Sequence, residues 1–309
     1  MKLLIHPISK SQGHKDSIYS LEKGTGENHF YSGSGDGFLV CWDLLNPDNG
    51  KVVAKIPAPV YSLKYLPTQN CIIAGQRNGG LHIIDLNTNK ETHFIQAFAN
   101  SIFDIILGEK VGTFYVASGD GSVSLWHIDS LHSIKIQKAT SQSSRTLAYN
   151  SNSHELAVGY SDHKIRIFDS DELKPKITLS GHKNSIFSLS YTPDNKYLLS
   201  GGRDAQIKIW EVASDYKEVT SIAAHTFAIN HISFRPDGKY FATASMDKNV
   251  KIWKTEDFQL VKVINQTKLD FHTSSVNKLL WTSDNLHLIT CGDDRLIFIL
   301  AVLEVQDSL

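Results

Sequence analysis

Short runs in which apolar and polar residues alternate cover most of the chain, and turn-forming residues separate them. In residues 185–212 the runs are SIFSLSY, YLLSGG and QIKIWEV, divided by TPDNK and GGRDA. A period of two residues is that of a half-buried β-strand, whereas an amphipathic helix repeats every 3.6 residues. A fourth run follows such a group, as in KVVAKIP at 51–57 or QLVKVIN at 259–265. The pattern predicts groups of about four short strands and no convincing helix.

These groups recur at a regular spacing. An Asp or Asn marks the turn before the third strand at positions 36, 78, 120, 162, 204, 247 and 294, so the intervals are 42 residues at first, then 43 and 47. Seven units of this length, with four strands each, are typical of β-propeller blades. The repeat covers nearly the whole chain, which predicts a single domain over residues 1–309. Six residues after each marker stands a large apolar residue: Trp42, Ile84, Trp126, Phe168, Trp210, Trp253 and Leu300.

The dipeptides that open and close the units resemble those of the WD40-repeat family. The opening pair is Gly13-His14 in the first unit and Gly181-His182 in the fifth, and the first unit closes on Trp42-Asp43. The resemblance implies an all-β fold, a seven-bladed β-propeller with four antiparallel strands per blade, and a role as a binding platform. Variants of the pairs stand at the same places in later units: Ala224-His225, Phe271-His272, Trp210-Glu211 and Trp253-Lys254.

The resemblance also implies a buried tetrad of His, Ser or Thr, Asp and Trp in the best-matching units. The Asp caps a tight turn and accepts a hydrogen bond from the His ring. The His also bonds the hydroxyl of the Ser or Thr, and that hydroxyl accepts the indole N–H of the Trp. Removing one member should cost ~1–3 kcal/mol, because its neighbour is left unsatisfied. The expected structural tetrads are His14, Ser32, Asp36 and Trp42 in unit 1; His182, Ser200, Asp204 and Trp210 in unit 5; and His225, Thr243, Asp247 and Trp253 in unit 6.

The other four units depart from this pattern, and we expect apolar packing to hold their blades instead. The departures are Ile56, Ala74, Asn78 and Ile84 in unit 2; Phe98 and Thr140 in place of the His in units 3 and 4; and Leu300 in place of the Trp in unit 7, which keeps His272, Thr290 and Asp294.

The last unit contains only three strand-like runs: SVNKLLW, HLITCGD and LIFILAV. Seven blades of four strands need one more, and KLLIHPIS near the N-terminus is the run left over. We therefore expect the N-terminal strand to pair as the outermost strand of the last blade. Such closure removes a free edge and joins the two ends of the chain.

Charge and composition narrow the classes of function. Lys and Arg total 31 against 32 Asp and Glu, a net charge of −1 that gives no global attraction to nucleic acid or anionic lipid. No apolar run reaches the ~18 residues of a membrane span. The three cysteines form no CxxC pair, so we expect buried reduced thiols at Cys41, Cys71 and Cys291. These observations predict a cytoplasmic protein without metal or cofactor.

A His–Asp–Ser set suggests catalysis, but the structural interpretation is favoured. The set recurs in three units, each time beside a Trp within a strand-and-turn framework, whereas a catalytic triad needs one copy, an exposed nucleophile and an oxyanion hole. GSGDG at 33–37 joins two strands and opens no helix, so it indicates a turn rather than a phosphate loop. We therefore expect no enzyme activity.

Three functions compete: a protein–protein scaffold or adaptor, a small-ligand sensor or enzyme with a site at the channel mouth, and a nucleic-acid binder. The absence of a catalytic motif favours a non-catalytic adaptor, with a monomeric propeller that binds a partner protein or peptide on the face around the central channel. We do not expect nucleic acid or membrane as partners.

Repeat positions locate the expected binding surface. Aromatic and arginine side chains that gather on one rim would grip an extended segment of acidic or C-terminal carboxylate character. Some of the aromatic residues could instead pack between blades. The position five after the repeat His gives Tyr19, Tyr61, Phe103, Arg145, Phe187, Asn230 and Asn277. The residue before each turn marker gives Gly35, Arg77, Gly119, Ser161, Arg203, Met246 and Asp293.

Overall fold

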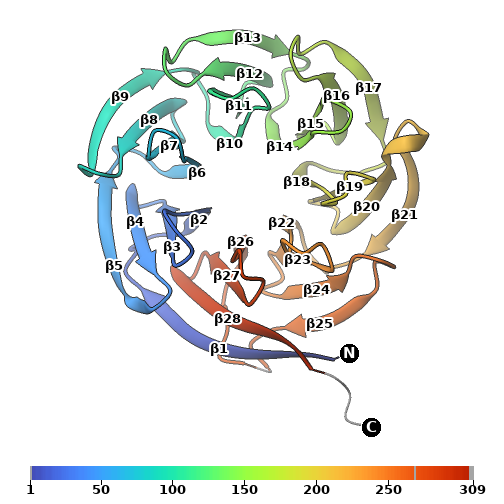
Figure 1. Cartoon of the computed structure of the whole chain (residues 1–309). Coiled ribbons are helices and arrows are strands. Elements are labelled where there is room, and N and C mark those ends of the chain that lie inside the picture. The colour runs from blue at the N-terminus through green and yellow to red at the C-terminus, as the bar shows by residue number, and fades with distance from the viewer. Residues whose placement is uncertain (1, 268, 306–309) are drawn as a thin grey trace.

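The short alternating runs form strands in a computed structural model of the protein, which describes residues 2–267 and 269–305. The strands build seven separate four-stranded antiparallel sheets. The sheets stand around a common axis like the blades of a propeller (Figure 1). The innermost strands of all seven blades line a central channel along this axis. The all-β, seven-bladed architecture predicted from the repeat is confirmed, and helix is confined to a single 3₁₀ turn at Val212–Ser214 within the described residues. None of the described segments forms a helix with the length and apolar character needed to cross a membrane.

Blades 1 to 6 each run in chain order from the channel outward. Blade 1 contains β2 (Ile18–Lys23), β3 (His29–Ser34), β4 (Phe38–Asp43) and β5 (Asn46–Lys55). Blade 2 contains β6 (Val60–Leu66), β7 (Cys71–Gln76), β8 (Gly80–Asp85) and β9 (Lys90–Gln96). Blade 3 contains β10 (Ile102–Leu107), β11 (Thr113–Ser118), β12 (Ser122–His127) and β13 (Ser133–Lys138). Blade 4 contains β14 (Ser144–Asn150), β15 (Glu155–Tyr160), β16 (Lys164–Asp169) and β17 (Pro175–Ser180). Blade 5 contains β18 (Ile186–Tyr191), β19 (Tyr197–Gly202), β20 (Gln206–Glu211) and β21 (Lys217–Ala223). Blade 6 contains β22 (Ile229–Phe234), β23 (Tyr240–Ser245), β24 (Val250–Lys254) and β25 (Leu260–Ile264).

Blade 7 joins the two ends of the described chain. It is built from β26 (Val276–Trp281), β27 (His287–Gly292), β28 (Leu296–Val305) and, on the outside, β1 (Lys2–Gln12). β1 pairs antiparallel with β28 from Lys2 opposite Val305 to Gln12 opposite Leu296, with a bulge between Pro7 and Ser9. A proline has no N–H to give to a sheet ladder, and an outer strand with a bulge tolerates it. The predicted closure of the last blade by the N-terminal strand is confirmed.

The apolar core lies between blades. Ile18, Phe30 and Trp42 of blade 1 cluster with Ile289 and Ile297 of blade 7. The other apolar clusters likewise join neighbouring blades, as when residues of blades 5 and 6 share one cluster. Since every blade buries its faces against its two neighbours, no blade keeps its core without them.

Two local expectations from the sequence are wrong. The fourth strand of blade 1 was expected at 51–57, but β5 spans Asn46–Lys55 because Asn46 already pairs with Asp43 across a tight hairpin. All three cysteines were expected to be buried thiols. They are free, but only Cys291 is buried, whereas Cys41 and Cys71 are partly exposed.

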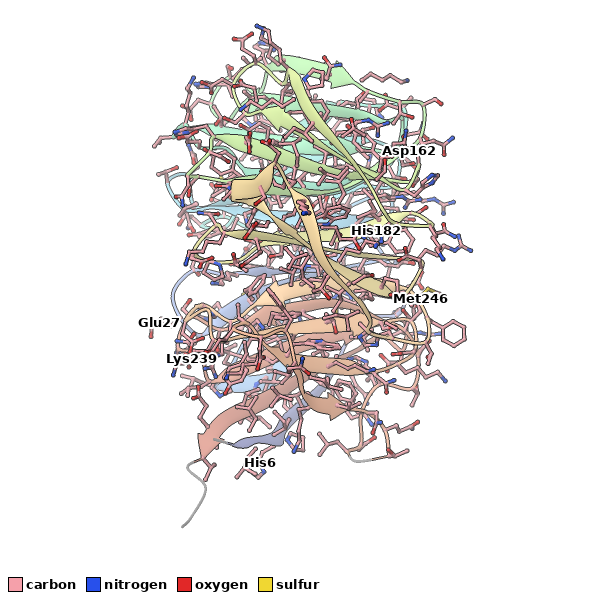
Figure 2. The ribbon with its side chains drawn as sticks, turned by 90° about the vertical axis from the view of Figure 1, so that its right-hand side faces the viewer. His6, Glu27, Asp162, His182, Lys239 and Met246 are labelled. Carbon is pink, nitrogen blue, oxygen red and sulfur yellow. The ribbon has the colours of Figure 1, made fainter. Side chains whose placement is uncertain are left out.

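The two faces of the propeller are built from different connections. The turns between second and third strands lie beside the segments that enter the innermost strands, as shown by the hydrogen bond from the Gly35 N–H to the Ser17 carbonyl. We call this side the top face; Asp162, His182 and Met246 lie on it, whereas Glu27 and Lys239 lie on the opposite, bottom face (Figure 2).

Candidate functional site

One residue in each innermost strand is left out of the strand pairing. In β10, for example, Ile102 pairs with Ser118 and Asp104 with Ala117, so Phe103 between them has no partner. A bulge of this kind bends the strand and re-aims a side chain, and bulges are common beside functional sites. All seven bulged residues are the positions five after the repeat His: Tyr19, Tyr61, Phe103, Arg145, Phe187, Asn230 and Asn277.

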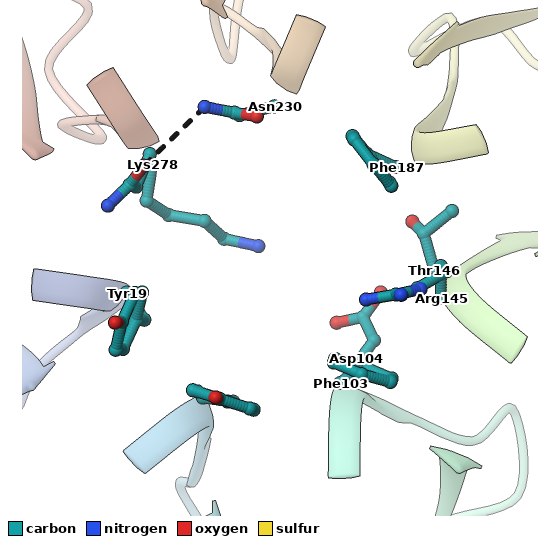
Figure 3. A pocket seen from close by; sticks show the side chains of 10 residues that line it. Tyr19, Phe103, Asp104, Arg145, Thr146, Phe187, Asn230 and Lys278 are labelled. Atoms are coloured by element: carbon teal, nitrogen blue, oxygen red, sulfur yellow. Dashed lines mark hydrogen bonds between the residues drawn. The ribbon is translucent and has the colours of Figure 1, made fainter. Parts of the chain in front are cut away.

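These seven side chains line one pocket of about 320 Å³ at the top mouth of the channel, which we call the rim pocket (Figure 3). Its aromatic members contact one another. The rings of Tyr19 and Tyr61 meet edge to face with centroids 5.0 Å apart, and Tyr61 stacks on Phe103 at 5.8 Å. The aromatic residues therefore form a continuous arc over blades 1 to 3 rather than packing separately between blades.

Arg145 extends this arc toward blade 5. Its guanidinium lies 4.1 Å from the ring centroid of Phe103 and 5.7 Å from that of Phe187, and its Nε donates to Ser161 Oγ at 2.9 Å. Burial, together with the charge of the nearby Arg203, lowers the pKa of Arg145. A guanidinium nevertheless stays charged in proteins. Among the described residues no carboxylate forms an ion pair with it.

Three further lining residues were missed by the sequence reasoning: Asp104, Thr146 and Lys278. Each directly follows a bulged residue, so the repeat spacing gives their positions, but only the bulge turns them into the pocket. Figure 3 shows the Lys278 side chain reaching toward the middle of the pocket. Within the described part of the chain neither Lys278 nor Arg145 forms an ion pair, although the Asp104 carboxylate lines the same pocket. Both oxygens of that carboxylate accept backbone N–H groups, from Ile105 and Leu147.

The residues after the bulges also tie the blades together. Asp104 Oδ2 accepts the Leu147 backbone N–H at 2.8 Å, and Thr146 Oγ1 accepts that of Leu189 at 3.2 Å. Ser188 and His231 accept equivalent N–H groups from the next blade at 2.9 and 3.3 Å. The Asp104 carboxylate is thus engaged in holding blade 4, and the floor of the rim pocket is a belt of bonds between neighbouring blades.

The rim is asymmetric, because blades 6 and 7 contribute amides instead of aromatic rings. Asn230 Nδ2 donates to Ser275 Oγ and to the Val276 carbonyl, both at 2.9 Å. Asn277 Nδ2 donates to the Ile18 carbonyl at 3.0 Å and to Asp293 at 2.7 Å. These bonds fix both amides and leave polar groups along one side of a pocket whose other side is aromatic.

Arg77 and Arg203, the remaining arginines expected on the rim, do not line the pocket. Both are exposed on top-face turns. Arg145 alone of the three arginines lines the pocket, although Arg203 lies near enough for its charge to act on Arg145.

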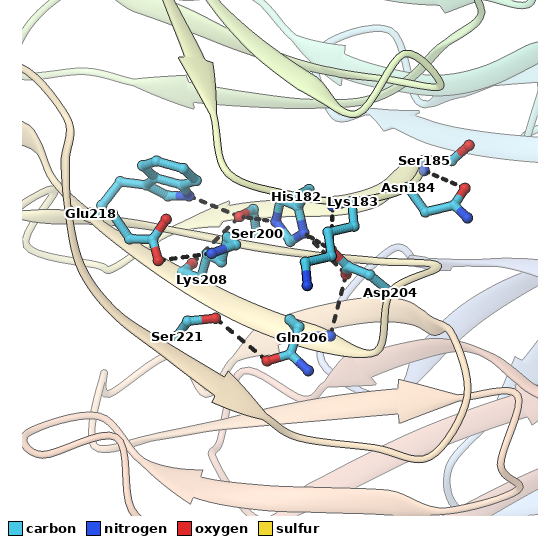
Figure 4. A network of polar contacts seen from close by, with 11 residues as sticks. His182, Lys183, Asn184, Ser185, Ser200, Asp204, Gln206, Lys208, Glu218 and Ser221 are labelled. Atoms are coloured by element: carbon cyan, nitrogen blue, oxygen red, sulfur yellow. Dashed lines mark hydrogen bonds and ion pairs between the residues drawn. The ribbon is translucent and has the colours of Figure 1, made fainter.

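The His, Asp and hydroxyl side chains of blade 5 form one buried chain of hydrogen bonds (Figure 4). His182 Nδ1 lies 2.9 Å from Asp204 Oδ2, its Nε2 lies 2.7 Å from Ser200 Oγ, and Trp210 Nε1 donates to that oxygen at 2.8 Å. The Asp204 carboxylate also accepts the backbone N–H of Lys183 at 2.9 Å. Burial alone would raise the pKa of Asp204, but these bonds outweigh it and hold the pKa below its usual range.

Blades 1, 6 and 7 contain the same arrangement. In blade 1, His14 bonds Asp36 at 3.1 Å and Ser32 at 2.7 Å, and Trp42 donates to Ser32 at 2.8 Å. Blade 6 repeats this with His225, Asp247, Thr243 and Trp253. Blade 7 has the first three members, His272, Asp294 and Thr290, with a buried Leu300 in place of the indole.

The remaining blades use substitutes. In blade 4 the two terminal nitrogens of Arg166 donate hydrogen bonds to the two carboxylate oxygens of Asp162, at 3.1 and 2.7 Å. In blade 3 Trp126 donates to Ser124 at 2.6 Å. Blade 2 buries His82, whose Nε2 lies 3.0 Å from Gln76 Oε1. Among the described residues, no three His, Cys, Asp or Glu side chains come together as a metal-binding group.

A family model for the WD domain, G-beta repeat, matches residues 5–43, 173–211, 216–254 and 264–299. The chain belongs to the WD40-repeat family. Each match is staggered against the blades: residues 173–211 begin near β17, the outer strand of blade 4, and end with β20 of blade 5. One WD40 repeat thus links two blades. The match over 5–43 does the same, because it runs from β1, the outer strand of blade 7, through the first three strands of blade 1.

Named relatives of this WD40 protein are similar over about two thirds of its length. It is 23% identical to Protein tipD of Dictyostelium discoideum over 204 residues, which are 65% of this chain and 33% of tipD. It is 24% identical over 222 residues to a guanine nucleotide-binding protein subunit beta of Oryza sativa subsp. japonica, covering 67% and 58% of the two chains. Identity to the ribosome biogenesis protein ytm1 of Aspergillus niger is 28% over 214 residues, covering 67% and 41%. The chain therefore spans less than two thirds of the length of these relatives, which as a group indicate protein-interaction scaffold roles in general.

Proposed function

We propose that this WD40 propeller is a non-catalytic adaptor that binds a partner protein on its top face. The bound part is an extended segment with an acidic side chain or a C-terminal carboxylate, seated in the rim pocket. The membership of the WD40 family supports the general role of an interaction scaffold. The chemistry of the pocket supports the acidic character of the segment.

The observation that carries the proposal is a pair of cations in an aromatic pocket. Arg145 stacks against Phe103, and its guanidinium points into the pocket, toward which Lys278 also reaches (Figure 3). Stacking leaves the edge of a guanidinium free, and that edge matches a carboxylate with two parallel hydrogen bonds. Partly buried cations interact more strongly with an anion than surface cations do, because water screens them less. An anionic group is therefore the ligand that this pocket fits best.

The aromatic arc supplies the apolar part of the recognition. Tyr19, Tyr61, Phe103 and Phe187 are all partly exposed at the mouth of the channel. Aromatic and arginine side chains gathered at one centre are typical of the residues that dominate binding energy in protein interfaces. An extended segment crossing the mouth would cover these rings on blades 1 to 3 and meet the fixed amides of blades 6 and 7.

A second candidate function is the binding of a small anionic molecule at the channel mouth. The volume of about 320 Å³ lies at the lower end of the range for small-molecule sites. Catalysis by the His–Asp sets is not supported by their environment, because the four histidines are buried and their carboxylates are bonded to the backbone.

Affinity purification from native cells with matched variants tests the proposal. The variant Tyr61→Ala/Arg145→Ala/Phe187→Ala removes the pocket, and Glu27→Ala/Lys239→Ala changes the opposite face and serves as control. We expect a discrete partner with the wild type and the control, and its loss with the pocket variant at an unchanged circular dichroism spectrum. Undiminished recovery with the pocket variant would place the interface elsewhere on the propeller.

A second experiment separates the acidic segment from the small molecule. Peptides tiling the recovered partner are titrated with a free and with an amidated C-terminus, and Arg145→Gln removes the charge while keeping much of the side chain. We expect at least one peptide to bind in a manner that requires Arg145 and an anionic group. A metabolite released on denaturing the purified protein, with no peptide binding, would favour the small-ligand function.

A further inference from the structure

Two rings of repeat-equivalent positions lie on the top face outside the rim pocket, and both change character in blade 6. The position two after the repeat His is small or polar in the other blades but Phe227 in blade 6. The residue before the turn marker is small, polar or charged elsewhere but Met246 in blade 6. The first ring is Asp16, Ala58, Asn100, Gln142, Asn184, Phe227 and Ser274, and the second is Gly35, Arg77, Gly119, Ser161, Arg203, Met246 and Asp293.

Phe227 and Met246 lie on neighbouring loops. Ser245 Oγ donates to the Phe227 carbonyl at 3.1 Å, and the Met246 N–H donates to the Ala228 carbonyl at 2.9 Å. The two side chains are 63% and 51% exposed, so neither is needed to fill the core. We call them the blade 6 pair. Among the described residues, the other large exposed apolar side chains lie on outer strands, at the C-terminal end of β28 or in bottom-face loops. This pair alone is large, apolar and exposed on the top-face connections of the described chain.

The blade 6 pair is next to the rim pocket in the fold. Phe227 precedes the bulged residue Asn230 by three positions, in the segment that enters β22. Met246 lies on the same face as His182 and Asp162 (Figure 2). A segment that leaves the pocket over blade 6, past Asn230, therefore runs onto Phe227 and Met246. Exposed apolar side chains beside a polar site are a frequent mark of an interface, and methionine adapts its shape to different partners.

We propose that the blade 6 pair is the second contact point of the same partner segment, and that it receives a bulky aliphatic or aromatic side chain. This inference rests on the proposed function, because Arg145 and Lys278 fix the anionic end of the segment. The occupant is thus one linear motif with an anionic group and, a few residues away in the chain, one large apolar residue. The two cations of the rim pocket complement the charge of the anionic group. The blade 6 pair, the one large exposed apolar surface on the described top-face connections, contacts the apolar residue.

The chain offers a direct reporter for this contact, because its two methionines are Met1 and Met246. In protein labelled with ¹³C at the methionine methyl groups, the Met246 signal reports on the blade 6 pair alone. The probes are synthetic decapeptides of glycine and serine that end in two glutamates with a free carboxylate. One probe has no apolar residue, and in the others a single leucine stands at each successive position before the glutamates.

We expect leucine at one or two positions to tighten binding by about tenfold or more over the leucine-free peptide, as burial of one such side chain predicts. The same peptides should shift the Met246 methyl signal. Phe227→Ala/Met246→Ala should reduce their affinity to that of the leucine-free peptide, and Arg145→Gln should weaken all peptides. Ile134→Ala/Ile136→Ala, which removes two exposed apolar side chains from β13, is the matched control and should change nothing.

Three results would overturn the inference in distinguishable ways. Binding that requires Arg145 but is indifferent to leucine, with an unmoved Met246 signal, would remove the second contact point and leave the proposed function standing. No peptide binding that depends on Arg145 would remove both. A Met246 signal that changes with protein concentration alone, and not in Phe227→Ala, would show that a second copy of the chain occupies the pair.

Discussion

Replacing Asp204 with alanine should destabilise the propeller by about 3 kcal/mol. Its carboxylate accepts from His182 Nδ1 at 2.9 Å and from the backbone N–H groups of Lys183 and Gln206 at 2.9 and 3.3 Å. His182 is buried, so no water replaces the lost acceptor, whereas the exposed Lys183 can turn to solvent. A donor left unsatisfied in a buried site costs ~1–3 kcal/mol. His182 and, to a smaller extent, the partly buried Gln206 account for the total.

Asp120 in blade 3 is the matched control, because that blade has no repeat His. Its carboxylate accepts the Ser122 N–H at 2.9 Å and makes no bond to a histidine among the described residues. Asp120→Ala should therefore cost about 1 kcal/mol. The unfolding entropy is about 2.1 cal/mol/K per residue, so in a domain of 309 residues each kcal/mol lowers the Tm by about 1.5 °C. We therefore expect a decrease of about 5 °C for Asp204→Ala and about 1.5 °C for Asp120→Ala.

Thermal unfolding followed by circular dichroism at neutral pH gives the two decreases, and hydrogen exchange shows whether the loss is centred on blade 5. Equal decreases in Tm for Asp204→Ala and Asp120→Ala would refute the reasoning, because the buried bond to His182 would then contribute nothing. A wild-type Tm for Asp204→Ala combined with lost partner binding would assign the residue to function rather than to stability.

Three further changes test other parts of the structure. Deleting residues 1–9 removes most of the pairing of β1 with β28 and should lower the Tm markedly; an unchanged Tm would contradict closure by this strand. Gly79 has φ +82°, and a Cβ there would lie 2.1 Å from the Phe98 carbonyl oxygen. Gly79→Ala should therefore lower the free energy of unfolding by more than ~1 kcal/mol, measured by urea denaturation. An unchanged urea midpoint would mean that the turn relaxes to accept the side chain. Burial lowers the pKa of His14 and His225, and the pKa of Asp204 is lowered as well. A group whose pKa is lowered in the folded protein stabilises it less as the pH falls through the pKa of the unfolded chain. The Tm should therefore decline below about pH 6.5, where the histidines protonate, and again below about pH 4, where the carboxylate does. A constant Tm from pH 7 to 5 would contradict the prediction for the histidines.

The sequence predicted the blades well where a polar set repeats and less well where it has drifted. Blade 5 was recognisable from His182, Ser200, Asp204 and Trp210, because a buried polar network tolerates few other residue types. The start of β5 was misplaced, because a hairpin that pairs Asp43 with Asn46 carries no apolar alternation. Blade 2 forms four strands although three of its four tetrad positions are apolar, since the packing of neighbouring blades is enough to hold it.

The candidate site was predictable in part for the same reason. Repeat spacing placed Tyr61 and Arg145 at equivalent points of the ring, but it passed over Asp104 and Lys278, which directly follow such points. Consecutive side chains of a regular strand point to opposite faces, so neighbours in sequence were not expected in one pocket. The bulge in each innermost strand breaks that rule and turns both residues toward the channel.

The sequence by itself determined the number of blades, the strand pattern within each and the polar sets that brace them, because these depend on residues within one repeat length of each other. Only the tertiary structure decided what residues of different blades do together. It placed Arg145 between Phe103 and Phe187, each 42 positions away, and brought Lys278 to the same pocket. Closing the ring sets these contacts, since it puts equivalent positions at one radius whatever their distance along the chain.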